Sequence, residues 1–104
     1  MHFGSTEYLE LIDKHDCNIL FEKGAPAGTL KRDLITLRSQ DGRAVAMSTP
    51  AGYHACPVEL SREIFDDFIA ASFIKQDGSE DAQGRMTFRL TPDGRAAARS
   101  RIVA

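Results

Sequence analysis

The chain has 104 residues, of which 42% are hydrophobic and 27% charged, and its net charge is −2. This composition excludes a wholly disordered chain, and no apolar run approaches the roughly 20 residues that a membrane helix needs. The N-terminus lacks the basic and apolar regions of a signal peptide, and two cysteines are too few for a disulfide scaffold. We therefore expect one cytoplasmic domain over residues 1–104.

The first predicted element is a helix that begins near Thr6. Leu9 and Ile12 start an apolar stripe with the 3.6-residue period of a helix. The tripeptide Asp16-Cys17-Asn18 has poor helix propensity, so we expect a break there. Residues 18–22 then either continue the helix or form a strand.

A β-hairpin is predicted over residues 33–49, because Asp41-Gly42 separates two apolar segments. A three-residue loop at residues 40–42 gathers four large apolar side chains on one face, which a two-residue loop does not do. We therefore predict a type I turn in which Gly42 takes the left-handed conformation of a β-bulge. The expected cross-strand pairs are Leu37 with Val45 and Ile35 with Met47.

The strongest helix pattern covers residues 60–73, where Ser61 is the expected N-cap. Its apolar residues recur at the spacing of one buried face. The members of this face are Leu60, Ile64, Phe65, Phe68, Ile69 and Phe73.

A second hairpin is predicted over residues 73–91, with a polar loop between Asp77 and Gly84. Met86, Phe88 and Leu90 alternate with polar residues, which is typical of a strand with one buried face. A last helix follows, with Thr91 as its cap and Pro92 as its first helical residue.

The segment Leu90-Thr91-Pro92-Asp93-Gly94-Arg95 resembles the turn that follows the wing in many bacterial winged-helix regulators. The resemblance extends over about 45 residues, from Leu60 to the end of the chain. It implies an α+β, winged-helix-like fold with a C-terminal wing hairpin at 73–91. It also implies a small, non-catalytic transcriptional regulator that binds DNA.

A second resemblance is to the YjhX-type toxin family, which is itself winged-helix-like. The residues that carry it are Lys23-Gly24, Gly42-Arg43, Gly52, Ile64-Phe65 and Phe73-Ile74-Lys75. Members of that family are linked to inhibition of a DNA topoisomerase. The resemblance therefore implies an inhibitor or modulator of a DNA-acting enzyme.

The charges are unevenly distributed along the chain. Residues 57–83 carry seven acidic and two basic side chains, whereas residues 84–104 carry five arginines and one aspartate. Such an asymmetry is one mark of a nucleic-acid-binding segment. The residues expected to contact DNA are Arg85, Arg89, Arg95 and Arg99. The alternative is that these arginines pair with the protein's own acids.

The acidic helix 60–73 is unsuited to the major groove, because its carboxylates would lie beside phosphates. It favours instead a protein partner with a basic surface. The residues expected at such a contact are Tyr53, Glu59, Glu63, Asp66 and Asp67. The first helix, with Tyr8 and Leu11 outside its main stripe, is a candidate homodimer contact.

Nothing in the sequence favours an enzyme. Two His-x-Cys pairs occur, His15 with Cys17 and His54 with Cys56, but they lack the usual spacing of zinc ligands. No motif marks either thiol as activated. We expect no catalytic residue, no metal site and no cofactor.

Overall fold

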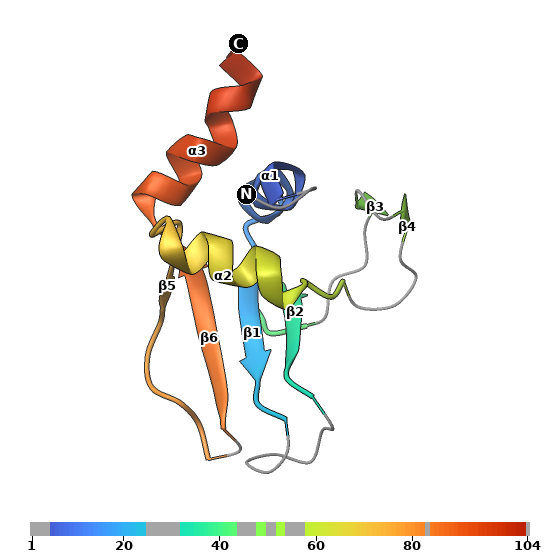
Figure 1. Ribbon diagram of the computed structural model, residues 1–104, viewed down its shortest axis with the longest axis vertical. Coiled ribbons are helices and arrows are strands. Elements are labelled where there is room, and N and C mark those ends of the chain that lie inside the picture. The colour runs from blue at the N-terminus through green and yellow to red at the C-terminus, as the bar shows by residue number, and fades with distance from the viewer. Residues whose placement is uncertain are drawn as a thin grey trace.

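The structure is a computed structural model that describes residues 5–24, 32–43, 48–49, 52–53, 58–82 and 84–103. For residues 48–49, 52–53 and 101–103 it describes the backbone alone. Within these ranges the fold is α+β, with three helices and a four-stranded antiparallel sheet (Figure 1). The elements are α1 (Ser5–Lys14), β1 (Asn18–Glu22), β2 (Leu34–Arg38), β3 (Ser48–Thr49), β4 (Gly52–Tyr53), α2 (Arg62–Ala70), β5 (Ile74–Gln76), β6 (Arg85–Leu90) and α3 (Pro92–Val103). No helix among the described residues is long and apolar enough to span a bilayer.

The strand order in the main sheet is β2-β1-β6-β5, and every neighbouring pair is antiparallel. Around this sheet the elements follow the order α-β-β-α-β-β-α, which is not the usual winged-helix arrangement. The predicted hairpin of β5 and β6 exists, and its second strand also pairs with β1 from Ile19↔Phe88 to Glu22↔Arg85, so it is part of the four-stranded sheet. Residues 18–22 are therefore a central strand, which resolves the helix-or-strand alternative.

The turn after β2 has the predicted geometry. Gly42 has a φ of +87° and donates to the Ser39 carbonyl over 2.9 Å, and the Ser39 amide donates to the Arg43 carbonyl over 2.8 Å. The three-residue loop is thus confirmed, and glycine suits it because a Cβ would strain this left-handed backbone.

The rest of the predicted 33–49 hairpin needs correction. In the predicted hairpin the Leu37 amide would donate to the Val45 carbonyl. In the structure it donates to the Val58 carbonyl over 3.0 Å. The Leu60 amide donates to the Ile35 carbonyl over 2.8 Å. Residues 58–60 thus lie along the outer edge of β2, while Val45 and Met47 lie outside the described residues. Apolar alternation predicts which face of a strand is buried, but it does not identify the neighbouring strand.

Helices α1 and α2 end in the same way, each with a non-glycine residue in the left-handed conformation. Asp16 has a φ of 51°, and the Cys17 amide donates to the Ile12 carbonyl over 3.0 Å. Ser72 has a φ of 59°, and the Phe73 amide donates to the Phe68 carbonyl over 2.9 Å. These six-to-one hydrogen bonds are Schellman caps, which turn each helix into the strand that follows.

Helix α2 is shorter than the predicted 60–73. Its N-cap is Ser61, as expected, and the Ile64 amide donates to the Ser61 hydroxyl over 3.3 Å. Phe65 lies in the core between Phe21, with ring centroids 5.3 Å apart, and Phe88, at 5.0 Å. Ile69, predicted on the buried face, is 41% exposed instead. A helix of two and a half turns packs only a narrow stripe, and position 69 lies beyond its edge.

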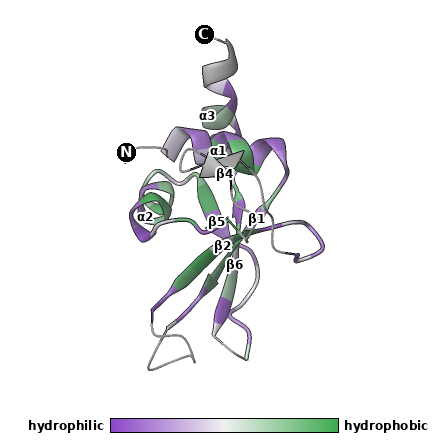
Figure 2. Cartoon of the chain, turned by 90° about the vertical axis from the view of Figure 1, so that its right-hand side faces the viewer, coloured by the Kyte–Doolittle hydropathy of each residue, from purple (hydrophilic) through white to green (hydrophobic). Residues whose placement is uncertain are grey.

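The two faces of the sheet differ in composition because successive residues of a strand point to opposite sides. The inner face contributes apolar side chains to a core that α2 covers from one side (Figure 2). These are Ile19, Phe21, Ile35, Leu37, Ile74 and Phe88. We call the opposite side the outer face; it carries Asn18, Leu20, Glu22, Leu34, Thr36, Arg38, Lys75, Arg85, Thr87 and Arg89.

Helix α1 packs against α3 at one end of the sheet (Figure 1). Tyr8, expected at a homodimer contact, is 8% exposed and belongs to the core together with Leu9 and Ile12. Tyr8 was expected outside the buried stripe of the helix. The side of α1 that packs on the core is wider than that stripe and includes Tyr8. Leu11 is half-buried against the same core.

The start of α3 is held against the end of α2 and the beginning of β5. The Thr91 hydroxyl donates to the Ser72 carbonyl over 2.6 Å and accepts from the Gly94 amide over 3.0 Å, so Thr91 is the predicted N-cap. The Thr91 amide donates to the Phe73 carbonyl over 2.9 Å. Gly94 lies so close that a Cβ there would be 2.2 Å from the Phe73 carbonyl oxygen.

We expect Gly94→Ala to lower the free energy of unfolding by about 2 kcal/mol, because the added methyl group overpacks a backbone contact. The measurement is urea unfolding followed by circular dichroism. In the control, Gly42→Ala, no atom lies within 4 Å of the added Cβ, so we expect only the cost of the left-handed backbone, about 1 kcal/mol. A Gly94→Ala protein more stable than the wild type, as helix propensity alone predicts, would contradict this packing.

Candidate functional site

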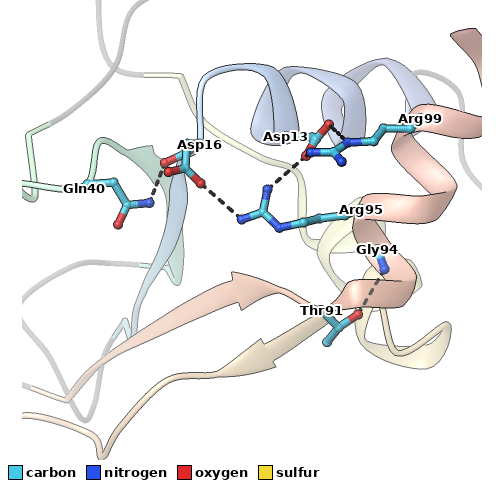
Figure 3. Close-up of polar contacts among 7 residues, drawn as sticks. All are labelled: Asp13, Asp16, Gln40, Thr91, Gly94, Arg95 and Arg99. Carbon is cyan, nitrogen blue, oxygen red and sulfur yellow. Dashed lines mark hydrogen bonds and ion pairs between the residues drawn. The ribbon is translucent and has the colours of Figure 1, made fainter.

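The four arginines expected to contact nucleic acid lie in two separate places. Arg85 and Arg89 belong to β6 and to the outer face of the sheet. Arg95 and Arg99 belong to α3 and face the end of α1 (Figure 3). The structure therefore does not bring the four together into one surface.

Arg95 and Arg99 form ion pairs with the acids at the end of α1 (Figure 3). Arg95 reaches Asp13 at 3.0 Å and Asp16 at 3.1 Å, while Arg99 reaches the other oxygen of Asp13 at 3.0 Å. The Gln40 side chain donates to the Asp16 carbonyl over 2.6 Å and ties the turn after β2 to the same point. This cluster connects three segments that are distant in sequence.

Asp13 is the centre of that cluster. Its side chain is 11% exposed and receives hydrogen bonds from both arginines. The Arg99 and Arg95 guanidinium groups lower the pKa of Asp13 below its ordinary value of 3.8, against the opposing effect of burial. The contact of α1 with α3 is thus partly electrostatic, and it uses two of the arginines that the charge pattern assigns to DNA.

The two outer-face arginines are also paired with acids. Arg85 contacts Asp81 at 2.7 Å, and Arg89 contacts Asp77 at 2.9 Å. Both acids belong to the polar loop between β5 and β6. Exposed ion pairs of this kind contribute about 0–1 kcal/mol, so they exchange readily for another anion.

The sequence analysis missed two further cations on this face, Arg38 of β2 and Lys75 of β5. The alternation within each strand places both on the polar side, but only the strand order puts Lys75 opposite Arg89 and Arg38 one strand further away, beyond Asn18. A hollow of about 430 Å³ lies on the same face. Its lining residues are Asn18, Leu20, Arg38, Ser39, Gln40, Asp41, Gly42, Asp81, Arg85 and Thr87.

The acids predicted for a protein contact lie on and beside α2. Glu63 and Asp66 are exposed, and Asp67 is half-buried. Positions 63, 66, 67 and 70 follow the spacing of one helix face. Exposed Ile69 adjoins this row, so the α2 surface combines carboxylates with one large apolar side chain.

Two arginines partly balance these acids. Arg62 pairs with Asp33 at 2.8 Å and with Asp66 at 3.0 Å, and Arg32 pairs with Glu59. Glu63 has no ion pair among the residues the structure describes. Tyr53 lies in β4, and its side chain is outside the described part of the chain.

Among the residues that the structure describes, the Cys17 thiol is not activated as a nucleophile. Cys17 is buried, and burial raises the pKa of its thiol, which opposes the nucleophilic thiolate. Within the described ranges, no three potential metal ligands come together. His54 and Cys56 lie outside these ranges.

We expect Asp13→Asn to lower the free energy of unfolding by about 1–2 kcal/mol at pH 7, because it replaces charge-assisted hydrogen bonds with neutral ones. The folded-state pKa of Asp13 is depressed, so its contribution is complete above its ordinary value of 3.8 and is lost as the pH falls through the lowered pKa. Denaturant unfolding at several pH values measures this difference.

The control for this series is Asp93→Asn, which removes an exposed carboxylate in the first turn of α3. We expect it to change the stability only slightly at any pH. An Asp13→Asn deficit that stays constant from pH 7 to below about pH 3 would contradict the assigned role of the Asp13 charge.

Comparison with family models, with curated proteins and with solved structures found no match to this chain.

Proposed function

We propose that this protein is a non-catalytic binding module that docks on a basic protein surface through the outward side of α2. The observation that carries the proposal is the composition of that side. It presents Glu63 and Asp66 on one helix face, and Asp66 adjoins Ile69, which is 41% exposed and is the one exposed large hydrophobic side chain in the described part of the chain.

The physical argument combines charge and apolar area. An exposed isoleucine supplies contact area that gains free energy when a partner excludes water from it. Carboxylates on the adjoining face of the helix, Glu63 foremost because Asp66 is paired with Arg62, favour a basic partner and disfavour an acidic one, which gives specificity and a faster encounter. A DNA groove is a poor match to this helix, because phosphates repel these carboxylates.

The class of partner follows from the resemblance to the YjhX-type toxin family. If the resemblance holds for activity, the partner is a DNA-acting enzyme such as a topoisomerase. The DNA-binding channel of such an enzyme is basic because it must neutralise phosphates. An acidic helix with an exposed isoleucine near its C-terminus complements that kind of surface and competes with DNA for it.

The alternative expectation, a transcriptional regulator that contacts DNA through the wing and C-terminal arginines, stays a prediction. Two observations favour the protein-docking proposal over it. Arg95 and Arg99 are ion-paired with Asp13 and Asp16 and connect α3 to α1. Arg85 and Arg89 lie in β6, so the four arginines do not form one surface that could contact a duplex.

The proposal is tested with a purified bacterial DNA topoisomerase, by calorimetric titration and by relaxation of supercoiled plasmid. We expect binding that weakens with salt and inhibition that excess plasmid DNA relieves. Glu63→Lys and Ile69→Ala should each weaken binding by about tenfold, because one reverses a contact charge and the other removes buried apolar area.

The matched control is Asp93→Lys. It changes the net charge by the same amount and also lies in the first turn of a helix, but on α3 instead of α2. We expect its affinity for the enzyme to stay within about twofold of wild type, since a distant exposed charge acts only through the screened overall field. Equal losses of affinity in Glu63→Lys and Asp93→Lys would mean that only net charge matters, and would contradict the assignment of the contact to α2. Absence of binding to any DNA-acting enzyme tested would overturn the partner class.

A further inference from the structure

One row of residues crosses the whole outer face and contains three cations and no acid. Arg38 of β2 is opposite Asn18 of β1, and Arg89 of β6 is opposite Lys75 of β5. The last β1–β6 pair is Ile19↔Phe88, so Asn18 and Arg89 are the next residues on their strands. We call Arg38, Asn18, Arg89 and Lys75 the cation row. At the usual strand spacing it is about 14 Å long.

The pairing of Lys75 with Arg89 points to a ligand. Like charges directly opposite each other on a sheet are destabilising. Lys75 is exposed and has no ion-pair partner among the described residues, while Arg89 has only Asp77, and these two side chains are 57% and 53% exposed. A pair so exposed to water is weak. An anion bound between Lys75 and Arg89 would relieve their repulsion.

Arg38 closes the other end of the row at the edge of the hollow. Its side chain is 23% exposed; Nε donates to the Thr36 hydroxyl over 3.1 Å, and one terminal nitrogen lies 3.5 Å from Glu22. The guanidinium has five N–H donors, so several stay available to a ligand. Leu20 and Thr87 line the hollow next to the row and add an apolar patch and a hydroxyl.

The acids around the hollow are each paired with an arginine of the chain. Glu22 pairs with Arg38, Asp41 with Arg43 at 3.1 Å, and Asp81 with Arg85. Asp77 pairs with Arg89, as above. The uncompensated charge of the face is therefore the Lys75 ammonium, with the spare donors of Arg89 beside it and those of Arg38 at the far end of the row.

We propose that the cation row binds the phosphates of a single nucleic-acid strand. The row is long enough for successive phosphates, and the hollow beside it is large enough for one nucleotide. The outer-face positions of the four strands hold no aromatic side chain for base stacking, so the contacts go to backbone phosphates, which carry no sequence information. This site is on the opposite side of the sheet from α2 and does not depend on the proposed protein contact.

The test is fluorescence polarisation of a labelled, mixed-sequence 20-nucleotide single strand, titrated with the full chain over a range of salt concentrations. We expect Lys75→Ala/Arg89→Ala to weaken binding at least tenfold at low salt. The slope of log affinity against log salt should become shallower by about 1.4, the value for two lost phosphate contacts on a single strand. Thermal unfolding of each variant checks that the fold is intact.

The matched control is Lys14→Ala/Arg32→Ala, which removes two exposed positive charges away from the outer face. We expect it to bind the strand within twofold of wild type. Glu63→Lys should also retain strand binding, so failure of this proposal is distinguishable from failure of the α2 contact.

Several outcomes would overturn the proposal. Equal losses in the two double variants would mean that only net charge matters. Binding of a mononucleotide, with no gain for the 20-nucleotide strand, would make the site a small-ligand site instead. Affinity for a duplex equal to or above that for the single strand would contradict the assignment to an unpaired strand.

Discussion

The fold depends on β1 pairing with β2 on one side and with β6 on the other. These two contacts join residues far apart in the sequence and place Ile19 and Phe21 at the centre of the core. They also fix the register, and with it the side on which every polar residue of the sheet lies. A slip of one residue in β1 would exchange the apolar and polar faces. The buried core and the cation row are therefore two consequences of the same hydrogen-bonding pattern.

Electrostatics in this small protein serve the fold as well as the surface. Asp13 and Asp16 engage Arg95 and Arg99, so charges from opposite ends of the chain hold α1 against α3. The basic segment seen in the sequence is thus not one binding surface, because two of its arginines connect α3 to α1. The two surfaces proposed above are local: the α2 side with Glu63, Asp66 and Ile69, and the cations of the outer face. They have opposite charge and lie on opposite sides of the sheet.

Features that depend on neighbouring residues were predictable. Ser61 and Thr91 are caps because their hydroxyls accept from the amide three residues on, and Gly42 takes the left-handed backbone that its turn requires. The expectations that failed involve distant segments. The edge of β2 is occupied by residues 58–60 and not by a hairpin partner, and Tyr8 belongs to the core. The four arginines predicted to form one nucleic-acid site lie in two places for the same reason. Arg95 and Arg99 form ion pairs with acids about 80 residues earlier in the chain.

The sequence by itself determined the local structural features of this protein. These are the two helix caps, the turn at Gly42, most of the buried stripe of α2 and the alternation of β6. Each of these is set by side-chain and backbone interactions within a few residues. Only the tertiary structure decided the strand order, the pairing of Arg95 and Arg99 with the end of α1, and the position of Lys75 beside Arg89. Those outcomes depend on which distant segments pack together, and many strand orders are compatible with the same alternation. The acids of α2 were visible in the sequence, whereas the cation row appears only once four strands lie side by side.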